Sequence, residues 1–338
     1  MVQVGLLATY VSGIYLEWAP LALSGLALVL PNLLFIWAIP ESPAYLAARG
    51  RYAATETALR TLGRDEDPAV YFKQIQTEAE PPRSVPGGLY SVKGALAFLK
   101  TYTDPAVWRP ALVCFAIMFF FQATGYNTVI AYSKLIFKES GLAIDDNLAI
   151  GVTGGVILVS CAVAIGLSKV TPRKVLLLVS SLGSAAALAA LGAYYYMKKT
   201  EGGGMAAFGW VPLTAMIGLI IFFMVGFGAV AWTVMAELLP AHVRGGIYPF
   251  AVAFSWVCNF AFALSFGYIQ RLFGSYASFW TYTALSLAGG VFIFFMVPET
   301  KDRSAEEVAA FFARRKTKEG LKEKTEGGRG VVEISTIA

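Results

Sequence analysis

Long runs of apolar residues, separated by short polar segments, make up most of the chain. Several runs hold about 20 residues without a charge, the length that an α-helix needs to cross the ~30 Å hydrocarbon layer of a membrane. The first run is the shortest, but it lacks the basic leader of a signal peptide. The pattern predicts an all-α integral membrane protein with eight transmembrane helices, at residues 2–16, 21–39, 111–131, 148–167, 175–197, 211–235, 247–269 and 279–297.

The composition agrees with lipid as the main solvent of the chain. Hydrophobic residues make up 57% of the 338 positions, charged residues only 14%, and the mean hydropathy is +0.61. A soluble globular domain does not have this composition. The three cysteines all lie inside apolar runs without paired spacing, so we expect neither a disulfide framework nor a metal site: Cys114, Cys161 and Cys258.

Basic residues are unevenly shared between the two sides of the predicted membrane. All but five of the 27 Lys and Arg residues fall in alternate connections and in the C-terminal tail. Loops rich in Lys and Arg stay on the cytoplasmic side of a membrane. The central loop and the tail are therefore predicted to be cytoplasmic, and the net charge of +5 requires no nucleic-acid partner. The five basic residues on the opposite side are Lys134, Lys138, Lys198, Lys199 and Arg271.

Polar residues divide the chain into four parts. The central loop has alanine, leucine and arginine at helical spacing, which predicts short amphipathic helices, and then a proline-rich connector at 80–88. The last residues are charged and contain glycine, which is typical of disorder. We predict two helices at 1–40, a cytoplasmic linker at 41–107, a six-helix bundle at 108–298 and a mostly disordered cytoplasmic tail at 299–338.

Amide side chains inside the third predicted span are the first candidates for a binding site. Gln122 and Asn127 are five residues apart, with Gly125 between them and Tyr132 about one further turn along. An amide both donates and accepts hydrogen bonds, which suits a ligand rich in hydroxyl groups, and glycine permits a break in the helix. Polar groups inside a span usually face a bundle interior or a water path. The alternative is hydrogen bonding between helices without any ligand.

Several motifs resemble the sugar porter branch of the major facilitator superfamily, in particular its facilitative glucose and trehalose transporters. Pro40-Glu41-Ser42-Pro43 and Pro298-Glu299-Thr300-Lys301 are similar to two family motifs, each of which follows a span and enters the cytoplasm. The segment 122–127 resembles the family's sugar motif of helix seven. Glu237-Leu238-Leu239-Pro240, together with Arg244, resembles the acidic and basic pair at the end of helix ten.

This resemblance implies a major facilitator-type bundle in which the eight spans correspond to helices five to twelve of twelve, so that helices one to four are missing. In the family, the solute lies between two six-helix halves that rock about it. The resemblance implies a substrate site formed by amides and aromatic rings, together with the Tyr132 position: Gln122, Asn127, Tyr132, Phe223, Trp232, Trp256 and Asn259. It also implies a cytoplasmic gate of ion pairs: Glu41, Arg173, Glu237, Arg244 and Glu299.

The chain departs from the family pattern at several of these places. Phe121 stands where the family usually has a second glutamine, and Ser255 stands where it has an asparagine. Met224 replaces an acidic residue. The proline-rich turn before Trp232 is replaced by the sequence at 228–231, which has no proline, so a proline kink is lost or left to glycine.

Two functions of different classes remain open. The first is facilitated transport of a sugar, trehalose or a hexose, by alternating access in the plasma membrane. The second is a truncated membrane protein that does not transport, or a partner subunit of a full-length transporter. The sequence shows no nucleotide-binding loop and no nucleophile with a paired base, so we expect no enzymatic activity and no cofactor. Its partners would be a small sugar and the lipid bilayer.

The predicted spans hold no central acidic residue, which argues against proton coupling through these helices.

Overall fold

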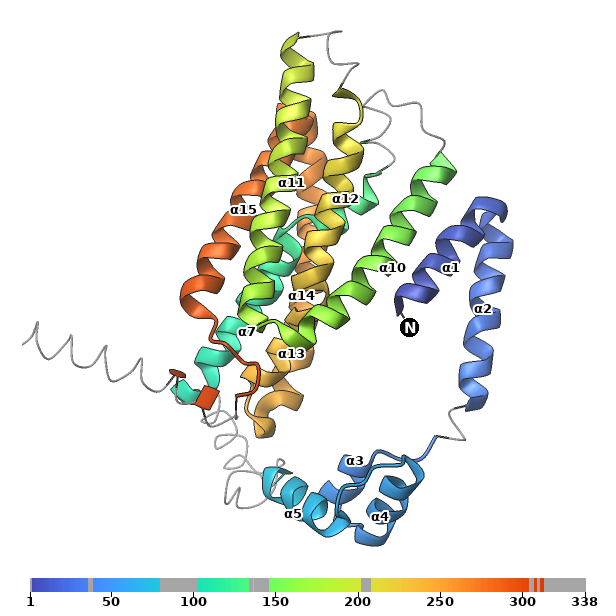
Figure 1. Ribbon diagram of the computed structural model, residues 1–338, viewed down its shortest axis with the longest axis vertical. Coiled ribbons are helices and arrows are strands. Elements are labelled where there is room, and N and C mark those ends of the chain that lie inside the picture. The colour runs from blue at the N-terminus through green and yellow to red at the C-terminus, as the bar shows by residue number, and fades with distance from the viewer. Residues whose placement is uncertain are drawn as a thin grey trace, which may run out of the picture. The chain divides into compact units, whose positions relative to one another are not determined.

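The structure is a computed structural model built from α-helices (Figure 1). It describes residues 2–35, 39–79, 103–133, 136, 146–201, 208–303, 307–308 and 311–312. The described chain divides into two compact units, Met1–Lys100 with Ala241–Gly245, and Thr101–Pro240 with Gly246–Ala338. Some predictions lie outside the described residues, namely those on the connector 80–88, on Lys134 and Lys138, and on the tail beyond 312.

The first unit begins with two apolar helices, α1 (Val2–Tyr15) and α2 (Trp18–Phe35). They occupy the first two predicted spans. At 1.5 Å per residue, the 14 residues of α1 extend about 21 Å, which is less than the thickness of a hydrocarbon layer. Crossing of the membrane by these two helices stays a prediction.

Three short helices follow in the predicted linker: α3 (Pro43–Ala48), α4 (Tyr52–Thr61) and α5 (Pro68–Ala79). Pro43 occupies the first turn of α3, where its missing N–H group costs no helical hydrogen bond. Leu46 and Leu59 are buried, and the rings of Tyr52 and Phe72 meet edge to face at 5.2 Å. The apolar side of each helix is thus covered by the other two.

The second unit holds the long helices, with α14 belonging to it from Gly246 onward: α7 (Pro105–Ala123), α8 (Tyr126–Ala131), α10 (Asp146–Val170), α11 (Arg173–Glu201), α12 (Val211–Phe223), η2 (Met224–Gly228), α13 (Ala229–Leu238), α14 (Ala241–Phe273) and α15 (Ser275–Met296). Within the described residues they form six stretches long and apolar enough to cross a membrane. These six confirm the last six predicted spans.

Small residues let the helices of this bundle approach closely. Helix α11 packs along α15 and α12. The ring of Phe222 lies over Gly183, and the indole of Trp280 lies over Gly192, where any added side chain would overlap it. Glycine at such contacts lets neighbouring helices in a membrane gain van der Waals contact, since lipid provides no hydrophobic force between them. Larger side chains fill the core beside these contacts, among them Leu188, Leu191, Tyr194, Tyr195, Met216, Leu219, Phe266, Phe279 and Tyr282.

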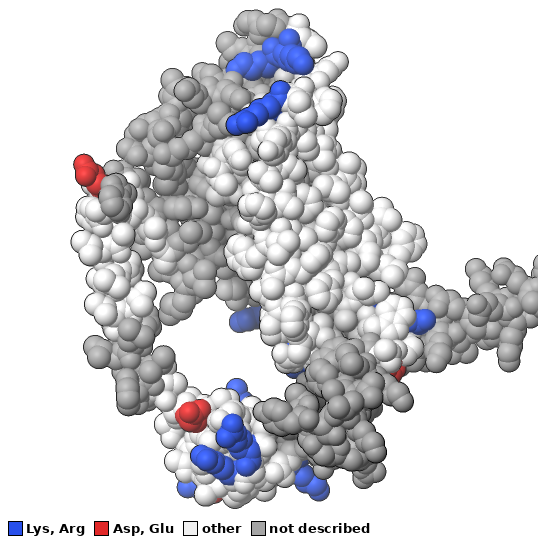
Figure 2. All heavy atoms as spheres, turned by 180° about the vertical axis from the view of Figure 1, so that it is seen from behind, with Lys and Arg blue, Asp and Glu red and all other residues white. Residues whose placement is uncertain are grey.

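Charged residues gather at the ends of the bundle. Figure 2 shows a broad surface without Lys, Arg, Asp or Glu over the middle of the bundle, and basic residues at its upper end. Helix α11 carries Lys198 and Lys199 in its last turn, and the ammonium group of Lys199 lies 5.1 Å above the ring of Tyr276. Tyr196 and Trp280 pack together nearby at 5.4 Å. Aromatic and basic side chains at this level are typical of a membrane interface.

Two predicted spans are interrupted within the bundle. The break that Gly125 was expected to permit is present, because α7 ends at Ala123 and Gly125 has the left-handed φ of 71°. In the span of α12 and α13, the proline kink is replaced by the π-helical turn η2. There the hydroxyl of Ser180, from α11, accepts a hydrogen bond from the N–H of Phe227 at 3.2 Å and donates to the carbonyl of Phe223 at 3.4 Å. A hydroxyl group inserted into the helical ladder compensates for the altered backbone bonding.

Candidate binding wall and ion-pair cluster

The break at Gly125 brings the two predicted amides together. Gln122 lies in the last turn of α7 and Asn127 in the first turn of α8. Asn127 Nδ2 donates to Gln122 Oε1 at 2.8 Å, and Gln122 Nε2 donates to Ser255 Oγ of α14 at 2.9 Å. We call Ser255, Gln122 and Asn127 the polar relay. Gln122 and Ser255 are buried, whereas Asn127 is half-buried and is the accessible member.

Aromatic rings from α7, α8, α12 and α13 form a cluster, to which the chain neighbours of Gln122 and Asn127 belong. Phe223 is stacked on Tyr126 with 4.1 Å between the ring centroids and 3° between the planes. Phe121 meets Phe223 at 5.0 Å and Trp232 at 5.4 Å, both edge to face. Phe121, which replaces a glutamine of the family pattern, is therefore a packing residue of an aromatic cluster. Trp232 is half-buried, so one part of its indole stays open for contact.

The remaining predicted binding residues belong to, or contact, α14. Trp256 is 60% exposed, and Asn259 is half-buried with no hydrogen bond to any described residue. The two follow Ser255 by one and four residues, so Asn259 lies one helical turn beyond it. Tyr132 is anchored differently: its hydroxyl donates to the carbonyl of Ala263 at 3.3 Å. Its position beside the others is thus fixed by a bond to the backbone of α14.

Ser255 was noted in the sequence only as a departure from the family pattern, and its bond to Gln122 was not expected. Interhelical hydrogen bonding, the alternative to ligand binding, is present for Gln122. It leaves the oxygen Oδ1 of Asn127, and both polar atoms of Asn259, without a hydrogen bond among the described residues. Amides can hydrogen-bond hydroxyl groups and indoles can pack against C–H groups, so a binding surface made of these residues stays a prediction.

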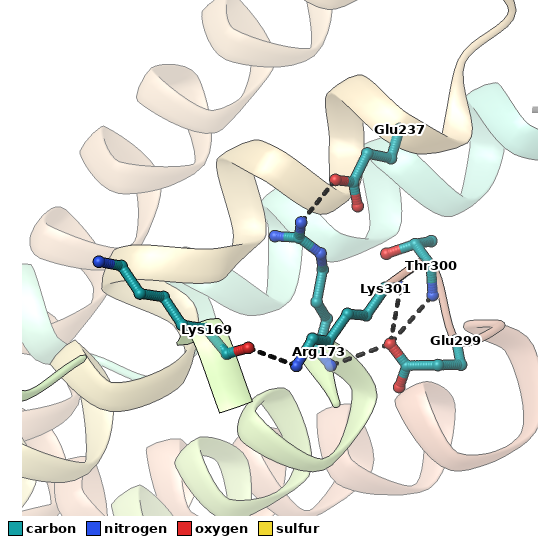
Figure 3. Close-up of polar contacts among 6 residues, drawn as sticks. All are labelled: Lys169, Arg173, Glu237, Glu299, Thr300 and Lys301. Carbon is teal, nitrogen blue, oxygen red and sulfur yellow. Dashed lines mark hydrogen bonds and ion pairs between the residues drawn. The ribbon is translucent and has the colours of Figure 1, made fainter. Parts of the chain in front are cut away.

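Glu299 organises the predicted gate at the other end of the bundle (Figure 3). Its Oε1 accepts from the backbone N–H groups of Arg173 at 2.9 Å, Thr300 at 3.1 Å and Lys301 at 2.9 Å, and its Oε2 accepts from Lys174 N at 3.1 Å. Arg173 and Lys174 open α11, whose first N–H groups have no helical partner. A carboxylate there also interacts favourably with the helix dipole.

Arg173 and Glu237 form an ion pair beside this carboxylate. Arg173 Nη2 lies 2.8 Å from Glu237 Oε1, and the two side chains are 21% and 30% exposed. Among the described residues, Arg173 Nε and Glu237 Oε2 have no hydrogen-bond partner although both atoms are buried. A single bond of this kind is weaker than a bidentate pair. The pair can therefore hold the helix ends together and still open at moderate cost.

The other two predicted gate residues belong to the first unit. Glu41 is exposed and directly precedes Ser42, the residue before α3. Arg244 is exposed in the first turns of α14. The structure therefore joins Arg173, Glu237 and Glu299, while the part played by Glu41 and Arg244 stays a prediction.

Comparison with known proteins gives one consistent family. The family model described as "Sugar (and other) transporter" matches residues 1–312. The facilitated trehalose transporter Tret1 of Drosophila willistoni is 33% identical over 90% of this chain, and that of Anopheles gambiae is also 33% identical over 90%. The chain spans 34% and 38% of the lengths of these two relatives.

Solved structures agree with the sequence relatives. The proton:xylose symporter XylE of the major facilitator superfamily, bound to 6-bromo-6-deoxy-D-glucose, matches 84% of this chain and 56% of its own, with a TM-score of 0.65 and 25% identity. An inward open conformation of the Escherichia coli xylose transporter matches 90% of this chain and 62% of its own, with a TM-score of 0.62 and 21% identity. The second match concerns the fold alone.

Proposed function

The chain belongs to the sugar (and other) transporter family of the major facilitator superfamily, and from this membership we propose that it takes part in facilitative transport of a sugar across a membrane. The observation that carries the proposal is the half-buried amide of Asn127 inside a membrane-spanning stretch of mainly apolar residues. Exposing an amide to hydrocarbon costs about 2–7 kcal/mol. We therefore expect the side chain of Asn127 to face a water-filled cavity and not the lipid.

The substrate in this proposal is trehalose or a hexose. Asn127 and Asn259 would bind sugar hydroxyl groups, while the indoles of Trp232 and Trp256 would contact the C–H faces of the sugar ring. The relatives that are similar over most of the chain are named facilitated trehalose transporters, which favours trehalose for the first measurement.

We further propose that the cytoplasmic gate opens and closes by alternating access. The ion pair of Arg173 with Glu237 and the contacts of Glu299 would hold one state closed on the cytoplasmic side. Because a switch must leave both states reachable, its total strength should be only a few kcal/mol, about the difference between two conformations that both become populated. The proposed location is the plasma membrane, with the central loop and the tail in the cytoplasm.

Uptake into vesicles tests the proposal. Wild-type protein in liposomes should take up labelled trehalose or glucose down its gradient, with the same initial rate when a protonophore is added. Asn127→Ala should lower this rate several-fold at a sugar concentration below KM. The matched control is Thr283→Ala, because among the described residues the hydroxyl of Thr283 bonds only to the carbonyl of Phe279 on its own helix.

The outcomes separate the two candidate functions. Wild-type vesicles that take up no more sugar than empty liposomes would refute transport by this chain and favour the non-transporting alternative. Uptake that Asn127→Ala leaves unchanged, at equal amounts of inserted protein, would remove this amide from the site while retaining transport. Uptake abolished by a protonophore would replace the facilitative mechanism with proton coupling.

A further inference from the structure

We propose that Ser255 is a positioning residue for the ligand, acting through Gln122 on Asn127. This inference rests on the proposed function, because it assigns a role within the same binding surface. Ser255 Oγ accepts from Gln122 Nε2 at 2.9 Å, which turns Gln122 Oε1 toward Asn127 Nδ2 at 2.8 Å. The polar relay therefore joins the half-buried amide of Asn127, through Gln122, to the buried hydroxyl of Ser255.

The polar relay restrains the orientation in which Asn127 meets a ligand. An amide has a donating end and an accepting end, and the torsion that exchanges them has only a shallow preference. With one N–H of Nδ2 held by Gln122, Asn127 keeps its oxygen Oδ1 and a second N–H group for a ligand. The polar relay thus holds in place an amide that can both accept and donate, which suits a ligand group that does both, such as a sugar hydroxyl.

The small size of Ser255 suits this indirect role. Its side chain is only 1% exposed, so it serves Gln122 and does not itself reach the surface. The neighbouring positions on α14 are open, since Trp256 is 60% exposed and Asn259 is half-buried. One turn of α14 therefore supplies a buried anchor for the polar relay and exposed side chains beside it.

Without Ser255, the arrangement should loosen although the ligand contacts remain. Gln122 is 4% exposed, so Ser255→Ala would leave a buried N–H group without its partner. The amide of Gln122 would then turn toward other acceptors, and Asn127 would no longer be held in one orientation. The expected effect is weaker sugar binding with little change in the rate of the transport cycle.

Sugar uptake by the full chain in liposomes measures this effect. Ser255→Ala should raise KM about fivefold to tenfold, which is the loss of affinity expected when roughly one hydrogen bond is lost. It should change the maximal rate less than twofold. Ser255→Thr keeps a hydroxyl group and should restore a KM close to that of the wild type. The control is Ser184→Ala, because Ser184 is fully buried and its hydroxyl has no hydrogen-bond partner in the described chain.

Thermal unfolding in detergent tests the polar relay without any sugar. Ser255→Ala should lower Tm when introduced into the wild type. It should not lower Tm further in the Gln122→Leu background, because the hydrogen bond between Gln122 and Ser255 is already absent there. Equal shifts in both backgrounds would refute the hydrogen-bonded relay. If Ser255→Ala had the KM of the wild type, the positioning role would be refuted, even if its effect on Tm depended on the presence of Gln122. Absence of uptake by the wild type would instead refute the proposed function, and the unfolding data would still decide the relay.

Discussion

Replacing Glu299 by glutamine tests whether one carboxylate joins the end of α15 to the start of α11. The substitution keeps the size of the side chain and one oxygen that accepts hydrogen bonds. It removes the negative charge and places an NH2 group where Oε2 accepts from Lys174 N at 3.1 Å. Two donors would then face each other, while the three bonds to Oε1 would become bonds to a neutral oxygen.

The magnitude follows from these contacts. A hydrogen bond to a charged group contributes about 1.5–3 kcal/mol, compared with about 1 for a neutral one, and a charge at a helix N-terminus contributes about 0.3–1 kcal/mol more. Since these contributions overlap and Glu299 is half-buried, we expect Glu299→Gln to cost about 2–4 kcal/mol in total. For a bundle of this size, that lowers Tm by about 5–12 °C.

Thermal unfolding in a mild detergent, followed by intrinsic tryptophan fluorescence, measures the shift. The matched control is Glu307→Gln, since Glu307 is 55% exposed and pairs with Arg303 at 3.3 Å in an i,i+4 arrangement. Exposed pairs of this kind contribute about 0.3–0.5 kcal/mol, so the control should shift Tm by about 1 °C. If both substitutions lowered Tm equally, the N–H groups that open α11 would have other partners, and the capping role of Glu299 would be wrong.

Two glycine substitutions test the interruptions of the helices. Gly125→Ala should lower Tm more than the control Gly63→Ala. Both glycines have left-handed φ angles, 71° and 62°, but only at Gly125 would an added Cβ meet the ring of Tyr282, at 2.9 Å. Equal shifts in Tm would exclude a steric role for that ring. Gly226→Ala should cost about 1–3 kcal/mol through overpacking, because its Cβ would overlap the backbone of α11. The control is Gly155→Ala on α10, where a Cβ would meet no other atom, so the substitution should leave Tm unchanged or raise it slightly. If Gly226→Ala did not lower Tm, η2 would be able to move away from α11.

Much of the candidate site could be predicted because polar residues are rare in these spans. Gln122 and Asn127 stand out in an apolar run, and Glu299 stands out in a motif at the end of one. Chemistry and spacing were enough to nominate the two amides, since hydrocarbon tolerates few such groups, whereas Glu299 was implied by the resemblance of its motif to the family. Their partners were harder to predict, because Ser255 is 133 residues from Gln122 and serine is common inside membrane helices.

The length and apolar character of the six confirmed spans were determined by the sequence itself, because the thickness of the bilayer sets the length of any helix that crosses it. The tertiary structure decided which side chains meet. It placed the hydroxyl of Ser180 in the turn η2 where proline was absent, and it turned Glu299 toward the first N–H groups of α11. Helices in lipid gain little from hydrophobic burial against one another, so their pairing depends on small residues and single polar contacts. Those contacts join residues that are far apart in the chain, so they cannot be predicted from the hydropathy along the sequence.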